Sequence, residues 1–249
     1  MNYLVGVFIA LLSFSTFAEH MNIYDESRDR NVPISIAYPV NVKVCQSNSP
    51  CEVIFISAGY RVPYEKYAFL TDLLTKLNYL VVSIDHELPS DPPLSRVGDL
   101  YETRIENWQR GAETINLVQG NLSKRFINYD FKHLTLVGHS NGGDISTWLT
   151  NENSSYVKQL ITLDHKRVTL PKNKKVKVLS VTSPEYPIKK GVLLTNSERK
   201  TYGVCVIEIP NSKHMDLTDY GSDFVKEKVI QIVNSFLSNE SCSSIKMPN

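Results

Sequence analysis

The chain has 249 residues, of which 42% are hydrophobic and 21% charged, a composition that is typical of a folded domain and excludes a disordered or fibrous chain. With 27 basic and 26 acidic residues the formal charge is only +1, and no run of Lys or Arg is long enough to follow a phosphate backbone. Nucleic acid is therefore not an expected partner, and the function must be sought in a localised site.

The segment 1–18 is typical of a secretory signal peptide. It carries no charged side chain, is apolar from Tyr3 to Leu12, and ends in Thr16-Phe17-Ala18, where small residues precede a cleavage position. The apolar run is too short to span a bilayer of about 30 Å. Because the segment has no Lys or Arg, the alternative is a buried N-terminal strand or helix. We expect export to the periplasm or out of the cell, and one domain over residues 19–249.

Strand-like and helix-like segments alternate from about residue 52 onward, which predicts an α/β domain whose mostly parallel sheet has helices on both faces. An earlier, half-buried strand is expected from the alternation over 34–38. A continuous apolar run predicts a buried strand at 53–56, and largely apolar segments predict further buried strands at 80–84, 134–137, 160–163, 176–181 and 204–209. Apolar residues at helical spacing predict helices around 69–77, 101–115, 145–149 and 224–236.

The chain has four cysteines, and all lie after the expected leader: Cys45, Cys51, Cys205 and Cys242. An even number in an exported chain favours disulfides, for which three pairings are possible. A bridge between Cys45 and Cys51 would pin a hairpin between two strand-like runs. A bridge between Cys205 and Cys242 would tie the end of the chain to a late strand, and a free buried thiol at Cys205 is the alternative. No cysteine or histidine spacing indicates a metal site.

Directly after the strand expected at 134–137 stands Gly138-His139-Ser140-Asn141-Gly142-Gly143, a G-x-S-x-G motif followed by helical spacing. A strand, a sharp turn and a helix are the context of a nucleophile elbow. The glycines allow backbones to approach closely, and the turn holds the serine in a strained conformation at the end of the strand. We therefore expect Ser140 to be a nucleophile. A glycine-rich turn without chemistry is the alternative.

A serine nucleophile needs a histidine to take its proton and a carboxylate to orient that histidine. On this kind of fold the acid and then the histidine follow the serine in the chain. His214 lies in a polar loop between the last strand and the last helix, the expected place of the base. His165 also follows the serine, but it directly follows a strand and adjoins Asp164. Asp164 and Glu185 are both candidate acids, and Asp164 is favoured because it ends its strand directly.

An oxyanion hole needs two backbone N–H donors, one from the residue after the nucleophile and one from the first strand-to-helix loop. The first donor is expected from Asn141. The second is expected from Gly59 or Tyr60, in the loop that follows the strand at 53–56. A simple turn glycine is the alternative role for Gly59.

Four segments of the chain resemble an α/β-hydrolase of the group that includes platelet-activating-factor acetylhydrolases, chlorophyllases and dienelactone-hydrolase-like esterases. They are residues 24–30 leading into Pro33 and Tyr38-Pro39, Ser57-Ala58-Gly59-Tyr60, Ser83-Ile84-Asp85-His86, and the motif at 138–143. The resemblance implies the α/β-hydrolase fold and hydrolysis of an ester through an acyl-enzyme. It assigns the nucleophile, acid and base to Ser140, Asp164 and His214, and the oxyanion donors to Tyr60 and Asn141. It implies no metal or organic cofactor.

The substrate expected from this reading is a small-molecule or lipid-like ester. Because only a short segment separates His165 from the strand at 176, no large cap domain fits there, and the loops 87–99 and 184–202 must form the pocket walls. An open site of this kind favours short acyl chains. A thioesterase, acyltransferase or peptidase using the same triad is the alternative, as is a non-catalytic binding protein on a hydrolase fold.

Overall fold

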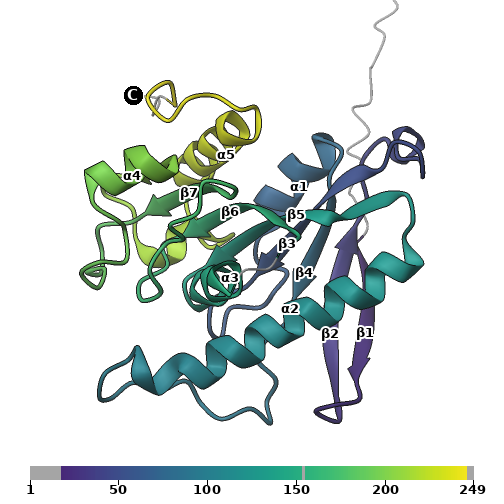
Figure 1. Ribbon diagram of the computed structural model, residues 1–249, viewed down its shortest axis with the longest axis horizontal. Coiled ribbons are helices and arrows are strands. Elements are labelled where there is room, and N and C mark those ends of the chain that lie inside the picture. Colours follow the sequence, from purple (N-terminus) through teal and green to yellow (C-terminus); the bar gives the residue numbers. More distant parts are fainter. Residues whose placement is uncertain (1–17, 153–154, 246–249) are drawn as a thin grey trace, which may run out of the picture.

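The computed structural model describes residues 18–152 and 155–245, so the predicted leader lies outside the described residues except for Ala18. Eight strands form one sheet in the order β1-β2-β4-β3-β5-β6-β7-β8 (Figure 1). β1 and β2 pair antiparallel, as do β2 and β4, and all other pairs are parallel. The strands are β1 (Glu19–Asp25), β2 (Arg30–Ala37), β3 (Cys51–Ser57), β4 (Leu80–Ile84), β5 (Tyr129–His139), β6 (Val157–Leu163), β7 (Lys177–Thr182) and β8 (Val204–Glu208).

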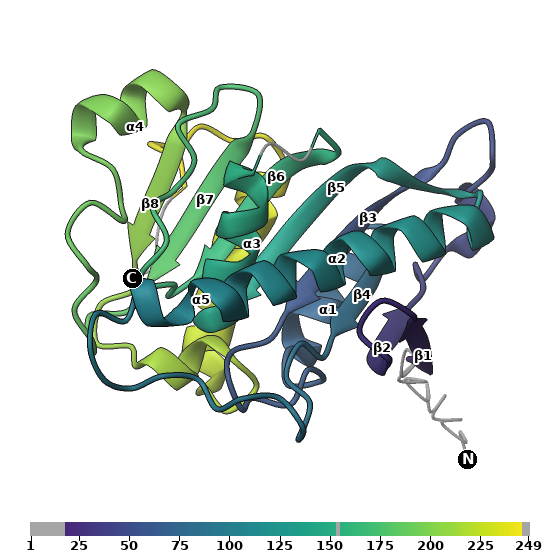
Figure 2. The same cartoon turned by 60° about the horizontal axis from the view of Figure 1, so that its bottom comes forward.

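Helices cover both faces of the sheet, as the alternation of segments predicts. α2 and α3 lie on one face, and α1 and α5 lie on the other (Figures 1 and 2). Successive residues of a strand point to opposite faces, so Leu136 and Val137 of β5 belong to different hydrophobic clusters. Leu136 packs in the cluster of Trp108, and Val137 packs in the cluster of Leu74. The helices are α1 (Ala68–Lys76), α2 (Ile105–Arg125), α3 (Asn141–Asn151), α4 (Asn196–Tyr202) and α5 (Asp223–Leu237).

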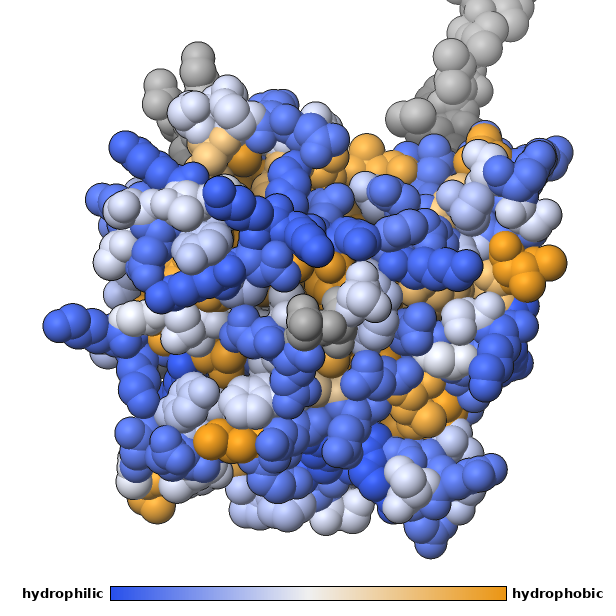
Figure 3. All heavy atoms as spheres, viewed as in Figure 1, coloured by the Kyte–Doolittle hydropathy of each residue, from blue (hydrophilic) through white to orange (hydrophobic). Residues whose placement is uncertain are grey.

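In the described part of the chain, no cap domain covers the edge that the carboxyl ends of the parallel strands form. The segment between β6 and β7 contains neither a helix nor a strand, which agrees with the expectation from its short length. Among the described residues, none of the helices combines the length and the apolar character needed to cross a bilayer. On the face seen in Figure 3, exposed apolar side chains form separate small spots within a mostly hydrophilic surface.

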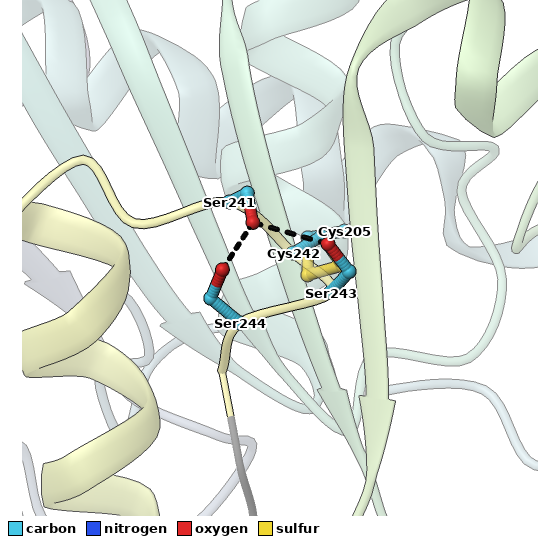
Figure 4. Close-up of a disulfide and its surroundings, with 5 residues drawn as sticks. All are labelled: Cys205, Ser241, Cys242, Ser243 and Ser244. Carbon is cyan, nitrogen blue, oxygen red and sulfur yellow. Dashed lines mark hydrogen bonds between the residues drawn. A yellow bond between two sulfur atoms is a disulfide. The ribbon is translucent and has the colours of Figure 1, made fainter.

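Two disulfides join the cysteines in the pairs Cys45–Cys51 and Cys205–Cys242. The first does not pin a hairpin between two strands, because the residues before Cys45 form a short 3-10 helix, Val42–Val44. It closes a turn that leads into β3. The second ties β8 to the segment after α5 (Figure 4), where Ile245 is buried against the core.

Loss of the Cys205–Cys242 bridge is expected to cost more stability than loss of the Cys45–Cys51 bridge. The cysteines are 37 and 6 residues apart, respectively. In the chain-entropy model, loops of these lengths contribute about 4 and about 2 kcal/mol to the free energy of unfolding. Urea unfolding of the two Cys→Ser double variants measures this difference. Equal losses would contradict it, as would free thiols in the unfolded, unreduced wild-type protein.

Candidate active site

Ser140 lies in a sharp turn between the end of β5 and the start of α3. Its φ is 53° and its ψ is −120°, a conformation that residues other than glycine rarely adopt and that costs on the order of 1–3 kcal/mol. Neighbouring backbones hold this turn in place. A Cβ on Gly142 would lie 2.1 Å from the carbonyl oxygen of Ser57, and one on Gly138 would lie 2.3 Å from that of Gly142. The turn therefore has the geometry of a nucleophile elbow.

Three side chains from separate loops form a continuous hydrogen-bonded chain at the carboxyl edge of the sheet. The Oγ of Ser140 lies 2.8 Å from Nε2 of His214, and Nδ1 of His214 lies 2.6 Å from Oδ2 of Asp164. Asp164 directly follows β6, and His214 stands in the loop between β8 and α5. Ser140 is only half-buried, so its hydroxyl can be reached by a substrate.

Asp164 is fully buried, but its carboxylate accepts hydrogen bonds from several donors. Besides His214, the Nζ of Lys166 lies 2.6 Å away, and Ser183 donates both its N–H at 2.9 Å and its hydroxyl at 2.8 Å. Burial by itself raises the pKa of Asp164, but the hydrogen bonds from His214, Lys166 and Ser183 outweigh it and hold the pKa at about 2. The carboxylate is therefore ionised at neutral pH.

The other two candidates from the sequence have different contacts. The exposed carboxylate of Glu185 accepts a hydrogen bond from the backbone N–H of His214 at 2.7 Å, and does not bind its ring. His165 is fully buried, and its Nε2 donates to the carbonyl of Val168 at 3.2 Å. Neither residue contacts Ser140 through a hydrogen bond.

Two backbone N–H groups beside Ser140 are candidates for binding an oxyanion. The N–H of Gly59 is occupied, because it donates to the hydroxyl of Tyr67 at 3.0 Å. Within the described residues, the N–H groups of Tyr60 and Asn141 have no hydrogen-bond acceptor. The side chain of Asn141 is held by two hydrogen bonds: its Oδ1 accepts from Trp108 Nε1 at 3.0 Å, and its Nδ2 donates to Asn107 Oδ1 at 2.8 Å.

A buried chain of hydrogen bonds, which the sequence did not reveal, connects the loops of the site. The ring of His139 contacts the hydroxyl of Tyr67 through Nδ1 and the carbonyl of His214 through Nε2, both at 3.0 Å. Since a carbonyl only accepts, His139 carries its proton on Nε2 and Tyr67 donates to Nδ1. Burial, with the nearby His214, lowers the pKa of His139 to about 3, so the ring is neutral. Through Tyr67 and His139, these hydrogen bonds link the loop of Gly59 to the loop of His214, the candidate base.

Shallow hollows lie beside the site. One of about 360 Å³ is lined by residues 98–101 and 187–189 together with Lys166 and Arg167, so the two loops expected to form the walls do meet. The ring of Tyr186 meets that of His214 edge-on, with centroids 5.8 Å apart. In the described part of the chain, no group of three His, Cys, Asp or Glu side chains is placed to hold a metal ion.

No family model matches the chain, and no curated protein shows significant sequence similarity to it. Solved structures do match. Esterase 2 from Thermogutta terrifontis has a TM-score of 0.68 at 11% identity, over 93% of this chain and 97% of that one. Its structures include one with bound butyrate and one phosphorylated by paraoxon.

Two further structures show the same likeness. A predicted CIB-like hydrolase from Thermoplasma acidophilum has a TM-score of 0.61 at 17% identity, over 90% of this chain and 100% of that one. Est1E from Butyrivibrio proteoclasticus has a TM-score of 0.61 at 13% identity, over 88% and 97%. The chain thus has the α/β-hydrolase fold that its motifs predict.

Proposed function

We propose that the protein is a serine hydrolase that cleaves carboxylic esters. Ser140 is the nucleophile, His214 the general base and Asp164 the acid that orients the base. One observation carries this proposal. A strained elbow presents Ser140 to His214, and both ring nitrogens of His214 are engaged, one by the serine hydroxyl and one by a buried carboxylate. That arrangement turns a poor nucleophile into an effective one.

The geometry supports a two-step acyl transfer. His214 takes the proton of Ser140 through Nε2 as the hydroxyl attacks the ester carbonyl, and it returns the proton to the departing alcohol. Asp164 keeps the proton of the imidazole on Nδ1 and stabilises the imidazolium. The N–H groups of Tyr60 and Asn141 bind the oxyanion of the tetrahedral intermediate. Water, activated by the same histidine, then releases the acid from the acyl-enzyme.

The open edge of the sheet supports small or surface-presented esters with short acyl chains as substrates. Within residues 18–152 and 155–245, no helix or strand is inserted between β6 and β7 to form a cap, and an open hollow lies near Lys166. The Thermogutta esterase, which has the same fold, has a structure with bound butyrate, a short-chain carboxylate. Export to an oxidising compartment is part of the proposal, and the two disulfides support it.

A serine-directed fluorophosphonate tests the nucleophile. We expect it to label the wild-type protein at Ser140 alone. A second serine, Ser57, also contacts a histidine, His86, at 2.9 Å, but that pair is buried, whereas the Ser140 hydroxyl can be reached from solvent. Ser140→Ala should abolish labelling, whereas Ser238→Ala, a change at an exposed position after α5, should leave it intact. Mass spectrometry of the peptides locates the label. Labelling that persists in Ser140→Ala rejects the assignment, and an unlabelled wild-type protein indicates a binding role instead.

Turnover of a p-nitrophenyl ester series, together with matched thioester and amide substrates, tests the reaction class. We expect the highest kcat/KM with acetate or butyrate esters and a steady fall for longer chains. A preference for thioesters or amides would move the protein to another class of acyl chemistry on the same triad.

A further inference from the structure

Resting on the proposed triad, we infer that Lys166 is a positioning residue, whose buried ammonium shares the carboxylate of Asp164 with His214 and extends the activity to lower pH. The segment Ser183–Tyr186 completes this arrangement by binding the acid, the base and the lysine at once. Neither role follows from the three triad residues, which need only one another and an oxyanion hole to act.

The position of Lys166 is unusual for a lysine. It is 6% exposed, and its Nζ lies 2.6 Å from Oδ1 of Asp164, while Oδ2 of the same carboxylate lies 2.6 Å from Nδ1 of His214. The second contact of Nζ is the carbonyl of Tyr186 at 2.9 Å. A lysine is almost never buried unless it is paired, and here the partner is the carboxylate that orients the base.

The segment Ser183–Tyr186 reaches each charged member of the site. Ser183 donates twice to Asp164, Glu185 accepts the backbone N–H of His214, and the carbonyl of Tyr186 accepts from Lys166. Three residues of one short segment, Ser183, Glu185 and Tyr186, thus fix the acid, the base and the cation relative to one another. This gives Glu185 a function as an anchor of the base loop, through the backbone of His214 and not through its ring.

The sign of the electrostatic effect follows from charge alone. An unpaired Asp164 would favour the imidazolium form of His214, which cannot take a proton from Ser140. The Lys166 ammonium, 2.6 Å from the same carboxylate, offsets part of that negative charge. Removal of Lys166 therefore moves the acid limb of kcat/KM to higher pH. We expect a shift of about 0.5–1 unit, because the Asp164 carboxylate lies between the lost charge and the ring of His214.

The other groups around His214 do not produce the same effect. The ring of His139, with centroids 4.7 Å apart, is neutral because burial lowers its pKa to about 3. Tyr186 contributes an uncharged ring. Glu185 is negative, is exposed to solvent, and acts on the backbone of His214. Lys166 is therefore the cation that opposes Asp164 directly.

The test is the pH dependence of kcat/KM for a short-chain ester in Lys166→Met, with Lys226→Met as matched control. Lys226 is a lysine of α5 paired with Asp223 at 2.8 Å, outside the triad and the hollow beside it. We expect the acid limb of Lys166→Met to move up by about 0.5–1 pH unit and that of Lys226→Met to stay in place. Lys166→Arg keeps the cation, so its limb should also stay.

A folded Lys166→Met whose acid limb is unmoved overturns the inference, because a merely structural lysine would lower activity without moving the limb. If Lys166→Met does not fold, Lys166→Gln, which keeps a donor but no charge, takes its place under the same criterion. Ser183→Ala removes a neutral donor from Asp164 and should move the limb in the same direction by less. Wild-type protein that lacks the fluorophosphonate label would instead reject the proposed function itself.

Discussion

Replacing Asp164 by Asn is expected to reduce turnover of a short-chain ester by about 10³–10⁴-fold. The amide keeps the shape of the carboxylate, but it does not stabilise the imidazolium and it favours the wrong tautomer of His214. The change also leaves the buried Lys166 without its anionic partner, and breaking a buried ion pair costs about 3–5 kcal/mol. Steady-state kinetics and thermal unfolding of the same variant separate these two losses.

A double variant distinguishes loss of catalysis from loss of folding. Asp164→Asn combined with Lys166→Met removes both charges, so we expect it to recover much of the lost stability and none of the lost turnover. Glu185→Gln is the second control. Its amide oxygen can still accept the N–H of His214, so we expect turnover to fall only a few-fold. A crippled Glu185→Gln beside an active Asp164→Asn would show that the acid has been misassigned.

The strands that bury both faces could be predicted from the sequence, because each contains a short, largely apolar segment. β1 could not, since of its residues only Ile23 and Asp25 are buried and it pairs along one edge. α4 was also missed, because it buries no residue and has no apolar stripe. Its local signals are nonetheless present: Thr195 and Glu198 form a capping box, and Gly203 ends the helix in the left-handed conformation.

Some residues of the site could likewise be predicted from the sequence, and others could not. Ser140, Asp164 and His214 each follow a strand in a recognisable local context, so their sequence positions were informative. Lys166 is two residues beyond Asp164 and is indistinguishable in the sequence from a solvated lysine, because its burial depends on the segment 183–186 from another loop. The contact of Tyr67 with His139 likewise spans 72 residues and is created by the convergence of separate loops.

Gly142→Ala is expected to abolish both fluorophosphonate labelling and stable folding. The added Cβ would lie 2.1 Å from the carbonyl oxygen of Ser57 and 2.4 Å from that of Ala58. Both are backbone atoms at the end of β3 and the start of the oxyanion loop. Neither can move away without disrupting the pairing of β3 with β5 or the donors beside Ser140. No small movement of the backbone can therefore relieve the clash.

Gly120→Ala is the matched control for this substitution. Gly120 lies in α2, and its Cβ would meet nothing within 4 Å, so the same change should raise the free energy of unfolding by roughly 0.5–1 kcal/mol. Soluble yield, the urea midpoint and labelling at Ser140 are measured for both variants. A Gly142→Ala protein with the wild-type midpoint and full labelling would mean that the elbow does not require the close approach of these backbones, and that the strained turn is not what presents Ser140 to His214.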